Sequence, residues 1–307
     1  MPGESSIFQS ALDGFELVGL RTDRVEIAIV PQLGAKILRL KNRCSGREWM
    51  WRPEGGRLFR NRPGDPFETS TMNGADDCLP TVAACEIAGR ALPDHGEVWS
   101  RPCEIDHSQQ NVIRTRLDLS SLPARFERAI SLRDHVVRID YRLANLSDDS
   151  HPFLWAFHPL MKIEAGDELD VPVNHVSVES ATLSGARQGD RWVWPTPVAG
   201  VELQRLNVGS PPGYAKMFAT SLASGRAEVF NSITGDRLTF SFDPAELPAL
   251  GIWITRGGWN GYHHFAIEPT QAPFDSLTDA AAAKACPILK PRGVTTWRIE
   301  LELHCDG

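Results

Sequence analysis

Hydrophobic and polar residues alternate with a period of two along much of this chain. The alternation is clearest in six segments, at residues 25–29, 113–119, 126–132, 137–143, 238–242 and 295–303. Successive side chains of a β-strand point to opposite faces of its sheet, so this pattern is typical of strands with one buried face. The turn Asp134-His135 between two of these segments predicts a hairpin. Together the segments predict an all-β chain, folded as an antiparallel β-sandwich or barrel.

Helical patterns are few. The best candidate is the segment 276–285, where Ser276 can act as the N-cap, Asp279 follows three residues later, and an alanine run comes behind. Pro287 cannot continue a helix and ends this segment. No low-complexity linker, charge block or short repeat divides the chain. We therefore expect residues 1–307 to form one domain with few short helices.

The composition is that of an ordinary globular protein, with 42% hydrophobic and 23% charged residues. A formal net charge of −7 argues against nucleic acid or an anionic membrane as a partner. Residues 1–15 contain no basic segment followed by an apolar one, so no secretory signal is expected. No apolar run approaches the roughly 20 residues that a membrane span requires.

Six cysteines are scattered along the chain without a CxxC pair: Cys44, Cys78, Cys85, Cys103, Cys286 and Cys305. This spacing lacks the pattern of zinc ligands, so we expect no metal site built from them. Scattered cysteines without a secretory signal are typical of reduced thiols, which predicts a cytoplasmic protein. We expect a monomer or a homodimer.

The stretch 73–102 carries more reactive side chains than any other part of the chain. Among its residues are two adjacent acids, a histidine, a tryptophan and an arginine that are candidates for a site: Asp76, Asp77, His95, Trp99 and Arg101. Pro93 and Gly96 are incompatible with a regular helix or a central strand here, so His95 should lie on a loop. Such a loop is typical of a small-molecule site. Adjacent carboxylates on extended chain point to opposite sides, so one of the two aspartates should bind a substrate hydroxyl or fix Arg90 or Arg101.

Three further residues are candidates for a site. His158 ends an apolar strand and is restrained by the following proline; it is either a core histidine or an imidazole aimed into a cleft. Glu268 ends the strand 261–268, on the same face as His264, and is either solvated or a desolvated base with a raised pKa. Trp259 and Trp99 lie on loops, where a flat ring could stack on a sugar, whereas Trp253 is expected to serve ordinary packing.

With these segments in hand, the chain resembles the aldose 1-epimerase (galactose mutarotase-like) superfamily. Four pieces carry the resemblance, in the family's order: residues 34–40 with Glu48-Trp49 behind them, Leu92-Pro93-Asp94-His95-Gly96, Phe157-His158-Pro159 and Ile267-Glu268-Pro269. The resemblance spans roughly residues 30 to 270. It implies a large antiparallel β-sandwich, the galactose mutarotase-like supersandwich, whose concave face binds a pyranose.

The resemblance also implies a reaction, which interconverts the α and β anomers of an aldose through the open-chain aldehyde. Glu268 matches the general base that takes the proton of the anomeric hydroxyl. His158 matches the general acid at the ring oxygen and His95 the histidine that polarises the substrate, although the two histidine roles could be exchanged. Such chemistry requires no metal, nucleotide or redox cofactor.

Departures from the family's patterns leave alternatives open. Hexose-6-phosphate mutarotases usually continue the Leu-Pro-x-His-Gly turn with Phe-Ala-Arg, whereas this chain has Glu97-Val98-Trp99, so the resemblance does not extend to the phosphate-binding pattern of that branch. The same fold could serve a non-catalytic carbohydrate-binding or sugar-sensing protein. A glycosidase that uses Glu97 and Glu268 as its carboxylate pair is a third reading, in which two histidines have no obvious part.

Overall fold

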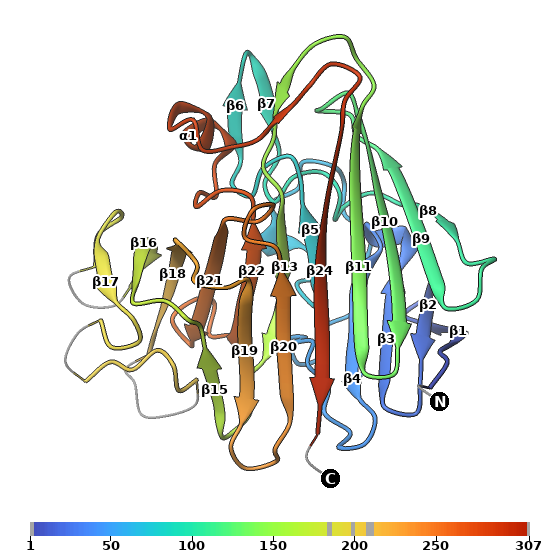
Figure 1. The fold of residues 1–307 in the computed structure, drawn as a ribbon, viewed down its shortest axis with the longest axis vertical. Helices are drawn as coiled ribbons and strands as arrows, with labels where there is room; N and C mark the ends of the chain where they lie inside the picture. The colour runs from blue at the N-terminus through green and yellow to red at the C-terminus, as the bar shows by residue number, and fades with distance from the viewer. Residues whose placement is uncertain (1–2, 183–185, 198–199, 207–211, 306–307) are drawn as a thin grey trace.

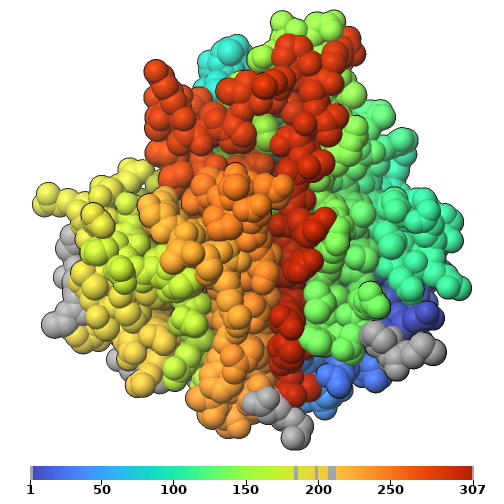
Figure 2. Space-filling view, in the orientation of Figure 1, coloured from blue at the N-terminus to red at the C-terminus, as the bar shows by residue number. Residues whose placement is uncertain are grey.

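Two antiparallel sheets pack face to face in the computed structural model, which describes residues 3–182, 186–197, 200–206 and 212–305 (Figure 1). The eight-stranded sheet has the order β15-β19-β20-β24-β11-β10-β9-β8. Its strands are β8 (Glu104–Asp106), β9 (Val112–Asp118), β10 (Ala124–Arg133), β11 (Val136–Asn145), β15 (Asp167–Asp170), β19 (Arg226–Asn231), β20 (Arg237–Phe242) and β24 (Val294–His304). Figure 2 shows the outer face of this sheet, with β24 running down its middle.

The second sheet has twelve strands in the order β1-β2-β3-β4-β5-β13-β22-β21-β18-β16-β17, with β14 paired to β22. Its strands in chain order are β1 (Ser6–Leu12), β2 (Phe15–Arg21), β3 (Val25–Val30), β4 (Lys36–Asn42), β5 (Ala75–Cys78), β13 (Ala156–Pro159), β14 (Met161–Lys162), β16 (His175–Ala181), β17 (Arg191–Val193), β18 (Gly213–Thr220), β21 (Ala249–Arg256) and β22 (His263–Thr270). The all-β prediction and the antiparallel sandwich are therefore confirmed.

The remaining elements are small. Two ribbons form from β6 (Cys85–Ile87) with β7 (Arg90–Leu92), and from β12 (His151–Pro152) with β23 (Ile288–Leu289). The helices are η1 (Pro31–Leu33), η2 (Phe67–Thr69) and α1 (Leu277–Ala282). The Ser276 hydroxyl accepts a hydrogen bond from the Asp279 backbone N–H at 3.2 Å, as the predicted N-cap requires. None of the helices in the described ranges is long and apolar enough to cross a membrane.

The predicted hairpin is formed by β10 and β11, which pair over their full length on either side of Asp134-His135. Aromatic rings then join the two sheets. Tyr141 on β11 stacks on Trp297 of β24 with 5.5 Å between ring centroids, and Trp155, which precedes β13, lies 4.7 Å from Tyr141 and 5.1 Å from Trp297. Because these large rings are fully buried, they fix how the inner faces of the sheets meet.

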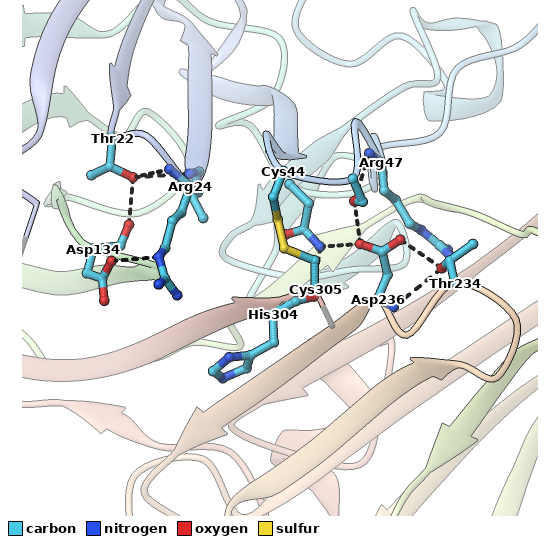
Figure 3. Close-up of a disulfide and its surroundings, with 12 residues drawn as sticks. Thr22, Arg24, Cys44, Arg47, Asp134, Thr234, Asp236, His304 and Cys305 are labelled. Atoms are coloured by element: carbon cyan, nitrogen blue, oxygen red, sulfur yellow. Dashed lines mark hydrogen bonds and ion pairs between the residues drawn. A yellow bond between two sulfur atoms is a disulfide. The ribbon is translucent and has the colours of Figure 1, made fainter. Parts of the chain in front are cut away.

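A disulfide joins Cys44, after β4, to Cys305, after β24, with 6.7 Å between their Cα atoms (Figure 3). The expectation of six reduced thiols is thus wrong for this pair, which is separated by 261 residues in sequence and meets only because the two sheets pack together. Disulfides persist mainly in oxidising compartments, so the cysteine argument for a cytoplasmic location no longer holds. The other four cysteines are free.

Candidate active site

Adjacent strands of the twelve-stranded sheet carry the side chains of one cavity, about 320 Å³ in volume. In this sheet β13, β22, β21 and β18 lie side by side (Figure 1). Their contributions are His158, Glu268, Trp253 and Lys216, respectively. A volume near 300 Å³ is at the lower end of the range of small-molecule pockets.

Strand alternation explains why β22 serves both the cavity and the core. His264 and Glu268 point into the cavity, whereas Phe265 and Ile267 between them are buried in the hydrophobic core. Gly251 of β21 lies opposite Glu268. A Cβ atom added to this glycine would approach the Glu268 Oε2 to 3.0 Å, so the missing side chain leaves room for the carboxylate.

Glu268 is a buried carboxylate with only one of its oxygens in a hydrogen bond. Lys216 donates to Oε2, while Oε1 accepts no hydrogen bond from the described residues. The Lys216 ammonium also lies 3.5 Å from Asp275 Oδ1, so it is shared between two acids. Burial raises the pKa of Glu268, and the neighbouring ammonium opposes that rise. The result is a carboxylate more basic than an exposed one, with a free oxygen facing the cavity.

His158 faces this carboxylate across the cavity. Its Nε2 lies 4.0 Å from Glu268 Oε1, and its Nδ1 has no hydrogen-bond partner among the described residues. The ring is therefore not the core histidine bonded to backbone that the sequence left possible. Burial lowers the pKa of His158 well below its usual value, and the positive charge of Lys216 acts in the same direction.

His95 completes the wall from the loop after β7, as predicted. Its ring stacks on Phe67 with 4.0 Å between centroids and lies 4.9 Å from the His158 ring. Asp94 Oδ1 holds its Nδ1 at 2.9 Å. Backbone geometry fixes the loop: His95 has a φ of 55°, and a Cβ on Gly96 would come within 2.1 Å of Leu79 O. An unusual conformation held this firmly is typical of a functional position.

His264 is the cavity's second unpartnered histidine. It is fully buried, and neither ring nitrogen has a hydrogen-bond partner in the described part of the chain. Burial, helped by the neighbouring His263, lowers the pKa of His264 to about 3, so the ring is neutral at physiological pH. A neutral imidazole with both nitrogens free can exchange hydrogen bonds with a polar guest. Trp259, as predicted, and Trp253 supply flat apolar surface beside it.

Two of the predicted substrate-binding residues are instead buried in ion pairs away from the cavity lining. Asp76 accepts from Lys36 of β4, and Asp77 pairs with Arg128 of β10 at 2.8 Å. The aspartates do point to opposite sides, as alternation predicted. Their partners, however, are neither Arg90 nor Arg101, because strands distant in sequence bring closer cations.

Trp99 and Arg101, which were also predicted to bind substrate, likewise lie outside the cavity lining. Trp99 is 3% exposed and packs inward, with its indole N–H donating to Asp94 O at 3.1 Å, so it braces the His95 loop from behind. Arg101 is held by Glu97 at 2.6 Å. The Glu97 carboxylate also accepts from the backbone N–H groups of Ser120 and Ser121, outside the cavity lining. The pairing of Glu97 with Glu268 that a glycosidase would need is therefore wrong.

Sequence reasoning missed Lys216, Asp275 and the exposure of Trp253 to the cavity. A lysine inside the otherwise apolar strand β18 was a usable signal, because such a cation needs a buried partner. No local pattern marks Asp275, which follows β22 after a short turn and reaches back to the cavity.

Comparison with solved structures identifies the fold. No family model matches the chain, and no curated protein matches it by sequence. Among solved structures, protein Slr1438 from Synechocystis sp. PCC 6803 is similar at a TM-score of 0.73 and 18% identity, covering 94% of this chain and 96% of that one. A galactose mutarotase-like protein from Clostridium acetobutylicum gives 0.69 and 13%, covering 99% of both chains. A candidate aldose 1-epimerase from Escherichia coli K12 gives 0.67 and 12%, covering 98% and 100%. The chain therefore has the galactose mutarotase-like fold that its motifs led us to expect.

Proposed function

We propose that the protein is a mutarotase that interconverts the α and β anomers of a neutral aldose. The proposal depends mainly on one observation: Glu268 Oε1 and His158 Nε2, both buried, lie 4.0 Å apart and open on the same cavity. The anomeric carbon of a pyranose bears two oxygens, the hydroxyl and the ring oxygen. Two groups this close can reach both oxygens at hydrogen-bond distance, each about 2.6–3.2 Å.

In the reaction, the Glu268 carboxylate takes the proton of the anomeric hydroxyl while protonated His158 gives a proton to the ring oxygen. The bond between C1 and the ring oxygen breaks, and C1 becomes an aldehyde carbon. After rotation about the bond between C1 and C2, the same transfers in reverse close the ring as the other anomer. No proton is gained or lost overall.

The pair must therefore share a single proton when it meets the substrate. Burial raises the pKa of Glu268 and lowers that of His158, so each pKa shifts toward the ordinary value of the other group. Activity should fall at low pH, where both groups are protonated, and at high pH, where neither is. We expect a bell-shaped dependence of rate on pH.

His95 and the remaining polar groups would bind the sugar's hydroxyls. Asp94 accepts from His95 Nδ1, which in the neutral ring leaves the Nε2 lone pair free to accept from a hydroxyl. Asp275 Oδ1 is buried without a hydrogen bond from the described residues, and His264 has two free nitrogens. Trp253 and Trp259 would stack on the sugar's C–H face.

Charge favours a neutral substrate over a phosphorylated one. Among the described residues that line the cavity, Lys216 is the one with a permanent positive charge, and it is already shared by Glu268 and Asp275. Glu68 and Asp94 add further negative charge. A phosphate dianion would meet net repulsion here without a free cation to bind it.

The test is exchange NMR of anomerisation across neutral aldoses, uronic acids and hexose 6-phosphates. The proposal predicts faster exchange than in buffer for at least one neutral aldose, and slower turnover for its 6-phosphate. Binding of a sugar without any acceleration would favour a carbohydrate-binding or sugar-sensing protein instead. A preference for hexose 6-phosphates would overturn the assignment of a neutral substrate.

A further inference from the structure

Three metal-ligating side chains converge at one end of the eight-stranded sheet, on residues that do not line the cavity: His135, Glu302 and His304. Their ligand atoms all lie within 4.8 Å of one another. His135 belongs to the turn between β10 and β11, and the other two end β24, which reaches the same end of the sheet (Figure 1). Glu302 and His304 are two apart on a strand, so both project from one face.

Both imidazoles aim at the same oxygen. His135 Nε2 lies 3.0 Å from Glu302 Oε1, and His304 Nε2 lies 2.9 Å from it. Ligands of a tetrahedral zinc ion, with bonds of about 2.0–2.2 Å, stand roughly 3.3 Å from one another. Small side-chain rotations would therefore open these contacts enough to admit an ion.

The other nitrogen of His135 shows why a cation suits this arrangement. Asp134 Oδ2 lies 2.9 Å from His135 Nδ1, which makes Nδ1 the protonated nitrogen of the neutral ring. Its Nε2 then carries a lone pair directed at a carboxylate oxygen, and the two repel unless a proton or a metal ion lies between them. A carboxylate that orients a histidine through its other nitrogen is the usual support of a metal ligand.

The backbone holds these ligands in place. The disulfide ties Cys305, next to His304, to Cys44 (Figure 3). Asn42 donates a hydrogen bond to His304 O at 2.9 Å. In the same view Thr22 donates to Asp134 O at 2.6 Å, and Arg24 lies 3.4 Å from Asp134 Oδ1. The His304 imidazole points away from the disulfide. All three ligands keep 22–39% of their side-chain surface exposed, so an ion can enter.

We propose that His135, Glu302 and His304 bind one divalent transition-metal ion of the zinc type, with Asp134 as the orienting carboxylate. Two imidazoles and one carboxylate form a ligand set that zinc accepts, with water in the remaining position. The bound ion would fasten the β10–β11 turn to the end of β24. The proposal is independent of the sugar chemistry, since none of these residues lines the cavity.

The test is isothermal titration calorimetry of the full chain with zinc chloride, together with thermal melting with and without zinc. We expect one zinc ion per chain and a higher Tm with zinc, because the ion binds the folded state. Glu302→Gln and His304→Ala should both abolish this binding, whereas Asp134→Asn should weaken it about 10- to 100-fold. His175→Ala, on the exposed end of β16, is the matched control and should leave it unchanged.

Melting in the absence of metal checks that each variant folds, and Glu302→Gln keeps the size of the side chain it replaces. Cobalt(II) absorption separates this site from the four free thiols, because thiolate ligation adds a charge-transfer band that imidazole and carboxylate do not. Absence of zinc binding to the wild type, a thiolate band, or undiminished binding in both Glu302→Gln and His304→Ala would overturn the proposal.

Discussion

Asp77 and Glu268 are both buried carboxylates of the twelve-stranded sheet, but they differ in how many of their oxygens form hydrogen bonds within the protein. Both Asp77 oxygens are used inside the protein, one by Arg128 at 2.8 Å and the other by the Trp155 indole N–H at 3.0 Å. Glu268 has one oxygen bound by Lys216 and the other free toward the cavity. A buried acid whose bonds are all satisfied internally stabilises the fold, whereas one with an unsatisfied oxygen in a cavity is prepared for a guest.

The largest expected effect concerns the group that faces Glu268. His158→Asn should lower kcat by about 10²- to 10⁴-fold, because the substituted side chain cannot transfer a proton to the ring oxygen. Exchange NMR measures the rate, and His175→Asn on the exposed start of β16 serves as the matched histidine control. A rate within a few-fold of the wild type would remove His158 from proton transfer.

The next largest effect is on stability and tests the role of Asp77, the carboxylate whose oxygens are both bonded within the protein. Asp77→Asn should lower the free energy of unfolding by about 3–5 kcal/mol, because the buried Arg128 loses its counter-charge. Asp118→Asn breaks a surface pair with Arg125, 2.7 Å apart, and should cost less than about 1 kcal/mol. Urea unfolding of the two variants measures both values. Equal losses of unfolding free energy in the two variants would show that burial of the Asp77–Arg128 pair does not increase its contribution to stability.

Lys216→Met should move the pH–rate profile to higher pH. The Lys216 ammonium favours ionised Glu268 and disfavours protonated His158, so it lowers the pKa of both groups. Removing it lets both pKa values rise, and each limb of the bell then shifts upward. Lys216→Arg keeps the charge and should restore most of the wild-type profile. A downward shift in the methionine variant contradicts this role.

The smallest effect is expected at the cavity's apolar wall. Trp259→Ala removes a ring that would stack on the sugar, a contact worth about 0.5–1.5 kcal/mol, so KM should rise up to about tenfold with kcat little changed. Steady-state kinetics at saturating and limiting sugar separate the two constants. A fall in kcat with KM unchanged would place Trp259 outside sugar binding.

Local patterns predicted the strands and the faces on which their side chains lie. Alternation placed His264 and Glu268 together on one face of β22, and it sent Asp76 and Asp77 to opposite sides. The same logic failed for partners, because Lys36, Arg128 and Lys216 come from strands 40 to 52 residues away in sequence. Pairings within and between the sheets depend on topology, which no local pattern of residue types specifies.

Loop side chains were the other source of error. Trp99 was expected to stack on a sugar because it lies on a loop, yet its indole N–H donates to Asp94 O and its ring packs inside. Trp259, also on a loop, does line the cavity. Both tryptophans follow turn residues, so the sequence alone could not distinguish the packed ring from the accessible one.

Exchange NMR of a neutral aldose with wild type and Glu268→Gln, at equal concentration of folded protein, tests the central claim most directly. We expect the variant to lower the rate of anomerisation by at least about 10²-fold, while the sugar's dissociation constant changes little. Asp275 remains 3.5 Å from Lys216, so the variant retains a counter-charge for the buried ammonium and should still fold. An undiminished rate in Glu268→Gln would contradict the assignment of this carboxylate as the base.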